Sequence, residues 1–253
     1  MSIMTYTPPV SQLLTLGDPT GKTDWRHYGS LGLRPEHIPE LIRMVLDEEL
    51  HWADSDSAAV WAPLHAWRAL GQLRAEAAIE PLLTLLRRID EHEDDWVSED
   101  LPVVFGLIGA AAIPSLANYL ANAEYPLFAR VAAAQAFRRI GEKHPATRAA
   151  CADKLMQQLE KYADNDRSLN AFLVGALLDL SIVEAVPLME RAFAAGSVDV
   201  SVNGDWEEVQ ISLGLKSHRD TPRPHFLAQE YGDLTSQAAS PKPRRQHRHK
   251  KKN

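Results

Sequence analysis

Apolar residues recur along most of the chain at the spacing of one face of an α-helix. Residues 79–86 carry Ile, Leu and Leu at the first, fourth and last positions, and residues 113–120 repeat the same three residues 34 positions later. Residues 150–162 and 185–193 show similar stripes. Spacings of three and four residues are typical of amphipathic helices, so each segment is predicted to form a short helix with one apolar face.

A second kind of helix is predicted before each of these. Segments 66–71, 104–109 and 136–141 share a large aromatic residue four positions before a final glycine, and segment 176–180 keeps the apolar spacing without the glycine. The ends of the four segments are 38, 32 and 39 residues apart. We expect each final glycine to take the left-handed conformation that ends many helices, because glycine has no Cβ to clash there.

Alternation of the two kinds of helix predicts the fold class. One helix pair cannot bury its apolar stripe alone, whereas stacked pairs form a continuous core. The sequence therefore predicts an all-α protein, an α-solenoid of about four helix pairs over residues 36–195. A lone helix over 39–50, apolar at positions 41, 42, 45 and 46, is expected to precede it. Residues 1–35 form an N-terminal extension, in which Trp25 and the loop before it are expected to cover that end.

The other end of the array is expected to carry its own cap, over residues 196–226. Asn203-Gly204 predicts a turn, and Asp205 is placed to cap a short helix whose third residue is Glu208. That helix would turn three apolar residues to one side: Trp206, Val209 and Leu213. The proline-containing stretch 220–226 is expected to be extended, and residues 227–253 are expected to be disordered because they have little to bury.

Composition agrees with a helical protein and bears on its disulfides, metal sites and cellular compartment. Glycine is sparse, with 13 residues, and aromatic residues make up only 7% of the chain. The one cysteine, Cys151, lies among alanines and is interpreted as a small buried side chain, which leaves no internal disulfide and no cysteine-rich zinc site. The first 17 residues do not resemble a signal peptide, and no apolar run approaches the ~20 residues that span a bilayer. A cytoplasmic protein without a membrane span is expected.

The repeated motifs resemble the HEAT-like repeats named after phycobilisome lyases, which occur in bacterial repeat proteins. The resemblance rests on segment 112–116, on the shorter copies described above, and on Arg130, Ala133, Ala134, Ala136, Phe137, Ile140 and Gly141. It covers roughly residues 36–195 and implies an α-solenoid with a concave binding surface. Such repeats serve scaffolds, adaptors and a few enzymes, so the resemblance says little about activity.

The net charge of −7 combines an acidic body with a basic tail. Residues 1–240 carry 20 basic and 34 acidic residues, a net charge of −14, whereas residues 241–253 contain no acid. The basic residues of the tail are Lys242, Arg244, Arg245, Arg248, Lys250, Lys251 and Lys252. One hypothesis is an arm that binds RNA, the ribosome or another anionic surface with salt-dependent affinity. The alternative is a solubilising tail or one that folds back on the acidic body.

Seven carboxylates gather in residues 90–100. The candidate positions for a cation site or for docking of a basic partner are Asp90, Glu91, Glu93, Asp94 and Asp95. The favoured interpretation is a solvated loop between repeats, with Ser98, Glu99 and Asp100 at the start of the next helix. A calcium loop of the EF-hand type needs a central glycine, which this run lacks.

No catalytic residue, metal site or cofactor is predicted. HEAT-like deoxyhypusine hydroxylases hold two irons through several His-Glu dipeptides, and only His92-Glu93 occurs here. Glu48 and His51 form a single Glu-x-x-His, which is too few ligands for a di-iron site. HEAT-like DNA glycosylases need a basic surface, whereas this body repels phosphate. A bilin lyase remains an alternative because the repeats resemble those enzymes.

Two side chains on the first repeat helix are candidates for a surface role. Trp67 aligns with Phe105 and Phe137, which predicts a core position. Trp61 and His65 are one turn apart and are expected to line a groove or, preferably, a contact between repeats. Together these observations favour a non-enzymatic interaction module that binds an unidentified protein partner.

Overall fold

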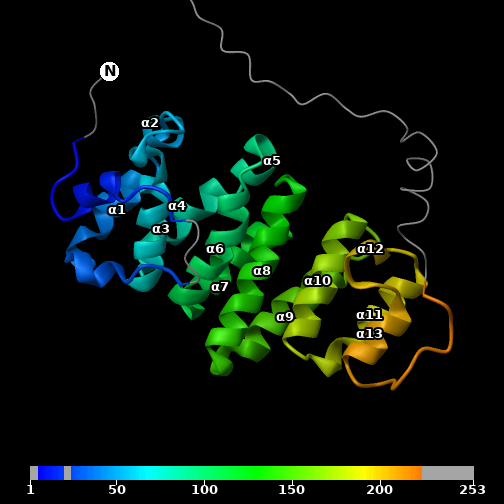
Figure 1. Ribbon diagram of the computed structural model, residues 1–253. Coiled ribbons are helices and arrows are strands. Elements are labelled where there is room, and N and C mark those ends of the chain that lie inside the picture. The colour runs from blue at the N-terminus through cyan, green and yellow to red at the C-terminus, as the bar shows by residue number, and fades with distance from the viewer. Residues whose placement is uncertain (1–4, 20–23, 224–253) are drawn as a thin grey trace, which may run out of the picture.

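The computed structural model describes residues 5–19 and 24–223, and these form helices joined by short turns (Figure 1). No β-strand occurs within these two ranges, which confirms the all-α class. The predicted tail, residues 227–253, lies outside them, as does the end of the expected extended stretch from residue 224 onward. In the described part, no single helix is long and apolar enough to cross a membrane. Residues 95–121 meet that test only as a pair of helices bent by 113°.

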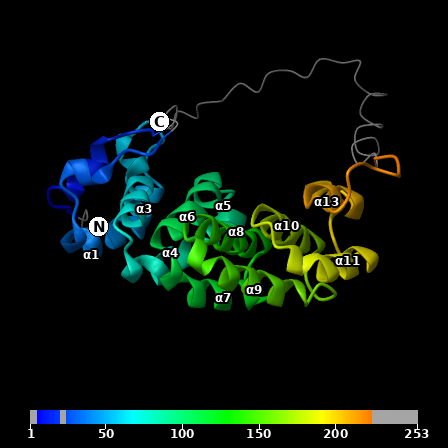
Figure 2. The ribbon, with the colours of Figure 1, turned by 90° about the horizontal axis from the view of Figure 1, so that it is seen from below.

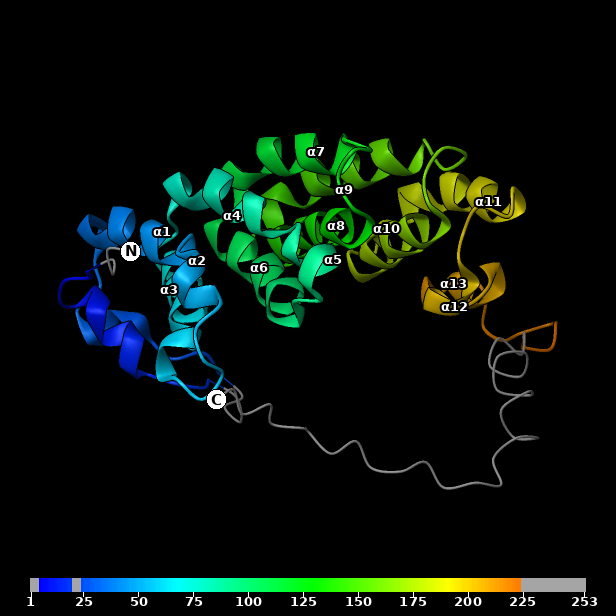
Figure 3. The same ribbon diagram turned by 90° about the horizontal axis from the view of Figure 1, so that it is seen from above.

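Four helix pairs stack into a curved two-layer array, as predicted. The inner helices are α3 (Ala62–Gln72), α6 (Asp95–Ile108), α8 (Leu127–Lys143) and α10 (Arg167–Asp179). The outer helices are α4 (Ile79–Leu85), α7 (Ile113–Ala121), α9 (Arg148–Leu159) and α11 (Val186–Ala194). Each inner helix packs on the next inner helix (Figure 2). Figure 3 shows that the inner row lines the concave side of the arc.

Single 3₁₀ turns lead into the outer helices. They are η5 (Glu76–Ala78), η6 (Ala110–Ala112), η7 (Pro145–Thr147) and η8 (Val183–Ala185). Most residues of the apolar stripes predicted for these helices are buried, and Ile113, Met156 and Phe193 are partly buried. Leu82 and Leu86 of the first pair and Leu116 and Leu120 of the second are each at most 1% exposed. Burial of these stripes between the two layers forms the continuous core that isolated pairs would lack.

The predicted helix over 39–50 is in fact two helices, α1 (Ile38–Val45) and α2 (Glu48–His51). Asp47 separates them, because its carboxylate accepts a hydrogen bond from the backbone N–H of Glu49 (3.1 Å) and so caps α2. The same carboxylate accepts a hydrogen bond from the Tyr6 hydroxyl (2.6 Å). The break turns the expected core residue Leu46 outward, to 41% exposure.

The N-terminal extension covers the first repeat, as expected. It contributes η1 (Val10–Thr15), η2 (Tyr28–Leu31) and η3 (Pro35–His37), and η4 (Ala58–Trp61) leads into α3. Leu13 and Tyr28 are buried against the repeat core. Trp25 is half-buried, and the guanidinium of Arg68 lies over its ring, 4.7 Å from the ring centre.

The C-terminal cap has the predicted short helix, α13 (Trp206–Ser212), preceded by an unpredicted one-turn helix, α12 (Val200–Asn203). The Asp205 carboxylate accepts a hydrogen bond from the backbone N–H of Glu208 (3.0 Å), which confirms the cap. Trp206 packs against Phe193 of α11, with ring centres 5.6 Å apart. α12 packs on α10 and so continues the inner layer.

The chain after α13 is held on that helix by the side chain of Glu207. Its carboxylate pairs with Lys216 and accepts hydrogen bonds from the backbone N–H of Asp220 (2.6 Å) and from the Thr221 hydroxyl (2.5 Å). Arg219 adds an ion pair to Asp205 (2.6 Å). The chain is therefore fixed to the cap until Arg223, the last described residue before the tail.

Buried side chains confirm most of the predicted core. Phe105 and Phe137 are fully buried and Trp67 is 3% exposed. Cys151 is also fully buried, and burial raises the pKa of its thiol to about 11. The thiol is therefore protonated near neutral pH and acts as a small apolar side chain.

The expected role of the glycines is wrong for two of the three. Gly71 and Gly141 lie inside α3 and α8, and only Gly109 has a positive φ, +90°. Gly71 and Gly141 instead lie on helix faces that touch the next inner element, and Gly106 of α6 does the same. A Cβ on Gly106 would lie 2.8 Å from the Cβ of Arg139, and one on Gly141 would lie 2.9 Å from a methyl group of Leu180.

The contacts between inner helices also give a different spacing for the repeats from the one predicted. Gly71, Gly106, Gly141 and Gly175 each approach the next inner element, and they are 35, 35 and 34 residues apart. This spacing is more regular than the 38, 32 and 39 obtained from the segment ends. The helix ends vary because each loop has its own length, whereas the contact between neighbouring inner helices recurs at a fixed position.

Gly106→Ala is expected to destabilise the protein by about 1–3 kcal/mol, because the added methyl group overpacks the contact with Arg139. Alanine favours a helix over glycine by about 1 kcal/mol. If the added methyl group met no close neighbour, Gly106→Ala would therefore be more stable than the wild type. Urea unfolding followed by circular dichroism measures the difference. An increase in the free energy of unfolding would show that the close approach is not required.

Candidate interaction surface

A pocket lined by tryptophans lies where the inner helices α3 and α6 begin. Its volume is about 230 Å³, and Trp61, Trp67 and Trp96 line it together with His51 and Arg88. The rings of Trp61 and Trp96 meet edge to face, with centres 5.5 Å apart. This arrangement is a favourable one for aromatic pairs, so it holds the two rings in place. We call this cavity the tryptophan pocket.

Local capping positions the two half-buried tryptophans. Ser57 caps η4 by accepting a hydrogen bond from the backbone N–H of Ala59 (3.2 Å), which places Trp61 at the entry to α3. Asp94 caps α6 by accepting a hydrogen bond from the backbone N–H of Val97 (3.2 Å), which places Trp96 in the first turn. Trp61 thus both lines a pocket and contacts the next repeat, so both interpretations of this residue hold.

His65 has a different role from the one predicted for it. It is 3% exposed and lies outside the pocket. One ring nitrogen lies 2.7 Å from the Tyr28 hydroxyl and the other lies 2.8 Å from the carbonyl oxygen of Gly17. His65 therefore fixes the N-terminal extension to α3 rather than joining two repeats.

A fourth tryptophan, Trp52, lies beside the pocket and was not anticipated. It is 62% exposed, the largest exposure among the large apolar side chains described. The guanidinium of Arg88 lies 5.4 Å from its ring centre, and the indole N–H donates to Glu48 (3.0 Å). A sequence signal for this cluster existed, since four of the six tryptophans fall within residues 52–96.

Charge at the base of the pocket is balanced. Arg88 is 8% exposed, and its guanidinium pairs with Asp94 (3.3 Å) and Glu48 (3.4 Å). His51 adds no charge near neutral pH, because burial lowers the pKa of its imidazole. Its Nε2 lies 2.8 Å from the carbonyl oxygen of Val45 and donates to it in the neutral ring.

Stability is expected to fall at acidic pH in part through His51. Below about pH 6.5 the unfolded chain takes up a proton on this imidazole, whereas the folded protein binds it only at lower pH. Protonation therefore favours the unfolded state, and the stabilisation present above that pH is lost as the pH falls. His51→Gln keeps a donor for Val45 and removes the titration. The loss of unfolding free energy between pH 7.5 and pH 5.5 should be smaller in the variant, and an equal loss would contradict this assignment.

The acidic run 90–100 is mostly helical rather than the expected loop. Asp90 belongs to α5 (Arg88–His92), and its carboxylate accepts hydrogen bonds from the backbone N–H groups of Phe128 (3.0 Å) and Ala129 (2.9 Å). It thus caps α8 of the following repeat. The solvated-loop interpretation is wrong for Asp90 and for Asp94, the cap of α6.

Asp100 departs furthest from the expected solvated position. It is 5% exposed, and its carboxylate pairs with Arg68 through two hydrogen bonds, of 2.5 and 3.0 Å. It also accepts a hydrogen bond from the indole N–H of Trp67 (2.9 Å). The pair therefore joins α3 to α6 inside the array, and arginine is well suited to such a two-point contact.

The remaining candidates of the acidic run are exposed, as expected. Glu91 pairs with Arg87 (3.0 Å), and Glu93 and Asp95 face solvent. Both lie next to Asp94 in the sequence, and Asp94 and Trp96 line the tryptophan pocket. We use the name acidic rim for the exposed carboxylates that lie close in the sequence to lining residues of the pocket: Glu48, Glu49, Asp54, Asp56, Glu93 and Asp95. Residues 47–57 and 89–100, which supply it, hold 12 acidic residues and no Lys or Arg.

Asp90→Ala is expected to lower the free energy of unfolding by about 1–2 kcal/mol, since it removes the cap of α8. Glu91→Ala is the matched control, because it removes a neighbouring exposed carboxylate and is expected to change stability by less than about 0.5 kcal/mol. Urea unfolding of the two variants distinguishes the residues. Equal effects would mean that Asp90 acts only through its charge.

The comparisons identify the repeat. A family model for the PBS lyase HEAT-like repeat matches residues 66–88, which run from the middle of α3 through α4 to Arg88. The chain therefore contains a HEAT-like repeat at these residues. The matched HEAT-like repeat contributes both Trp67 and Arg88 to the tryptophan pocket. No curated protein and no solved structure shows significant similarity to the chain.

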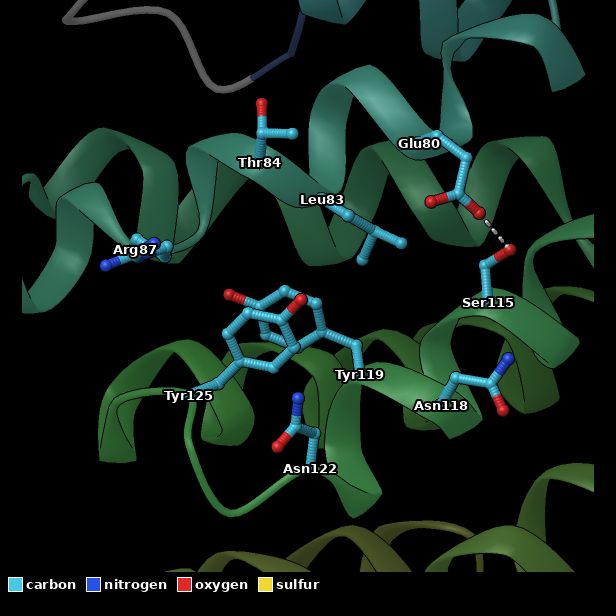
Figure 4. A pocket seen from close by; sticks show the side chains of 9 residues that line it. All are labelled: Glu80, Leu83, Thr84, Arg87, Ser115, Asn118, Tyr119, Asn122 and Tyr125. Atoms are coloured by element: carbon cyan, nitrogen blue, oxygen red, sulfur yellow. Dashed lines mark hydrogen bonds between the residues drawn. The ribbon is translucent and has the colours of Figure 1, made fainter.

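A second cavity lies in the outer layer of the HEAT-like array, between α4 and α7 (Figure 4). It is larger, about 440 Å³, and both polar and apolar side chains line it. Glu80 accepts a hydrogen bond from the Ser115 hydroxyl (2.6 Å), and the rings of Tyr119 and Tyr125 stack with centres 4.0 Å apart. The Tyr119 hydroxyl is buried without a hydrogen-bond partner among the described residues, and burial raises the pKa of this phenol.

The histidine motifs weighed as metal ligands are engaged elsewhere. The ring of His92 packs edge to face on Trp52, with centres 5.0 Å apart, and His51 points to a backbone carbonyl. Within residues 5–19 and 24–223, no three His, Cys, Asp or Glu side chains are placed to hold a metal ion together. The basic candidates of the tail, from Lys242 to Lys252, lie outside the described residues.

Proposed function

We propose that this HEAT-like repeat protein is a non-enzymatic interaction module. It holds an extended segment of a protein partner along its inner helices, and the tryptophan pocket anchors that segment. The observation that carries the proposal is a cavity lined by the half-buried Trp61 and Trp96, with the exposed Trp52 packed on Arg88 of the same lining. Tryptophan is enriched among the residues that dominate binding energy at protein interfaces.

The size of the cavity supports a peptide side chain as its occupant. Pockets that enclose drug-sized molecules have volumes of about 300–1,000 Å³. The tryptophan pocket, at about 230 Å³, is smaller and lies where α3 and α6 begin. A single side chain of an extended segment fills such a space, and the rest of the segment then continues along α6 and α8.

Its rigid walls also favour binding. Trp61 and Trp96 hold each other edge to face, and Arg88 is fixed by Asp94 and Glu48. A pocket whose side chains are already in place loses little conformational entropy when a partner binds. The affinity per contact is therefore higher than on a surface that must first become ordered.

Capture from a native lysate tests the proposal with three full-length baits. They are the wild type, Trp52→Ala/Trp96→Ala, and the outer-layer control Tyr125→Ala. We expect a specific protein to be retained by the wild type and by the control and to be lost from the pocket variant. Retention of the same proteins by all three baits, or of no specific protein by any, would contradict the proposal.

A chromophore-processing activity is the competing proposal, because the matched repeat takes its name from PBS lyases. It predicts that the purified protein takes up a bilin and shifts its absorption band. An unchanged spectrum at saturating bilin would count against it. RNA association through the tail is a third proposal, which predicts binding that weakens steeply with salt and disappears when residues 241–253 are removed.

A further inference from the structure

The tryptophan pocket has the chemistry of a site for a cationic side chain. The face of a tryptophan ring attracts guanidinium and ammonium groups through its quadrupole. Two arginines of this chain already use that attraction: Arg68 lies over Trp25 and Arg88 lies over Trp52. Trp61 and Trp96 line the cavity beside Arg88 and present indole surface to an incoming group.

Electrostatics around the cavity also favour a positive ligand. The positive charge of Arg88 is matched by Asp94 at the base, so the guanidinium does not repel a cation strongly. Exposed carboxylates neighbour the lining residues: Glu48 pairs with Arg88, and Asp95 directly precedes Trp96. Asp54 and Asp56 flank Ser55, which also lines the cavity. Carboxylates next to aromatic rings attract a cation and limit its loss of hydration.

A segment of matching charge exists in the same chain. Residues 241–253 carry seven Lys or Arg residues and no acid, whereas residues 1–240 have a net charge of −14. The described structure ends at Arg223 beside α13, and 17 residues separate it from Pro241. The charge of the tail therefore complements the rim, provided that this linker is long enough to reach it.

The contour length of the linker exceeds the distance across the inner layer. An extended chain spans about 3.3–3.6 Å per residue, so the linker covers up to about 60 Å. α12, α10, α8 and α6 pack in succession. Neighbouring helix axes are about 8–10 Å apart, so α12 and α6 are separated by about 30 Å. The contour length of the linker is thus about twice the separation of α12 and α6.

We propose that the basic tail, residues 241–253, docks on the acidic rim of its own chain and places a Lys or Arg side chain in the tryptophan pocket. The inference deepens the proposed function, because it assigns the same pocket a cationic occupant and an internal competitor. A tethered tail acts at an effective concentration in the millimolar range, so even weak docking occupies the pocket. A partner must displace the tail to bind, and the contact weakens as salt screens the charges.

Peptide titration tests the docking directly. The protein is a full-length variant in which every Lys and Arg of residues 241–253 is replaced by serine, and the probe is a synthetic peptide of the natural tail. We expect a saturable change in tryptophan emission, with an affinity that falls at least tenfold between 50 and 500 mM NaCl. Adding Trp52→Ala/Trp96→Ala should weaken the peptide at least tenfold, whereas Tyr125→Ala should leave it unchanged. No saturable change, or equal affinity in the pocket variant, would overturn the proposal.

Zero-length cross-linking tests the contact within the wild-type chain. A carbodiimide joins an amine to a carboxylate in direct contact, and peptide mass spectrometry of the monomer locates the links. We expect Lys250–Lys252 to be joined to Glu48, Glu49 or Glu93 at low salt. Equal linkage to Glu184 and Glu190, which are exposed on the far outer end of the array, would contradict a specific site.

Two results separate this inference from the proposed function. Serine replacement of the tail's basic residues is expected to increase partner capture, because the pocket is then free. If the tail peptide fails to bind while capture still depends on Trp52 and Trp96, the inference is wrong and the proposed function stands. If the peptide binds the pocket but no partner is captured, the proposed function fails alone. RNA binding that requires the tail charges and leaves tryptophan emission unchanged would overturn the docking inference.

Discussion

Asp100→Ala is expected to lower the free energy of unfolding by about 3–5 kcal/mol, which is a large part of the stability of a typical domain. The side chains of Asp100 and Arg68 are 7% and 8% exposed and are joined by two hydrogen bonds. Removing the carboxylate leaves the Arg68 guanidinium buried without its charged partner. It also deprives the Trp67 indole N–H of its acceptor. Urea unfolding at neutral pH measures the effect.

A double variant serves as the control for charge. Arg68→Leu/Asp100→Leu removes both ions together, and replacing a buried pair by apolar side chains is often close to neutral. It should recover most of the stability lost in Asp100→Ala. A double variant as unstable as the single one would mean that Asp100 acts through packing rather than by neutralising Arg68. Because the pair joins α3 to α6, its loss is also expected to loosen the base of the tryptophan pocket.

Trp96→Ala is expected to weaken partner binding by at least thirtyfold, which corresponds to about 2 kcal/mol, the usual threshold for a dominant interface residue. The variant removes one wall of the pocket and the edge-to-face partner of Trp61. Fluorescence anisotropy or calorimetry with the captured partner measures the change. Circular dichroism and urea unfolding show whether the fold survives the substitution.

Trp52→Ala is expected to weaken partner binding with little change in the free energy of unfolding. Its side chain is 62% exposed, so the free energy of unfolding should change by less than about 0.5 kcal/mol. We still expect binding to weaken about tenfold, because the indole lies beside Arg88 at the rim of the pocket. A Trp52→Ala variant that binds normally would remove Trp52 from the proposed surface, and a Trp96→Ala variant that binds normally would remove the pocket.

Apolar spacing predicted the fold because each stripe has only one way to be buried. Leu82, Leu116 and Leu155 all face the space between the two layers, as their spacing indicates. The two ends of the array were also predictable from the sequence. Asp205 precedes a short helix with one apolar side at the position of an N-cap, and Trp25 is a large apolar residue before the first α-helix. The glycines were misread because helix-ending and helix-packing glycines look alike in sequence. Gly106 lies inside α6 against Arg139, whereas Gly109, only three residues later, ends the same helix with a positive φ.

The candidate site was much harder to predict than the fold. The sequence does not show which carboxylates of an acidic run become buried. Asp90, Asp94 and Asp100 therefore could not be told apart from the exposed Glu93. The roles of Asp90 and Asp100 depend on Phe128 and Arg68, which are more than 30 residues away from them in the chain. The pocket joins Trp61 of one repeat to Trp96 of the next, and only the helix stacking brings them together.

We propose that a protein partner binds through the tryptophan pocket, which lies where α3 and α6 begin. Hydrogen–deuterium exchange of the full-length protein, with and without the captured partner, tests it most directly. We predict slower exchange in peptides that cover residues 48–61 and 88–97, with little change in residues 113–125 of the outer layer. Protection confined to the outer layer, or none in the two pocket segments at saturating partner, would contradict the claim.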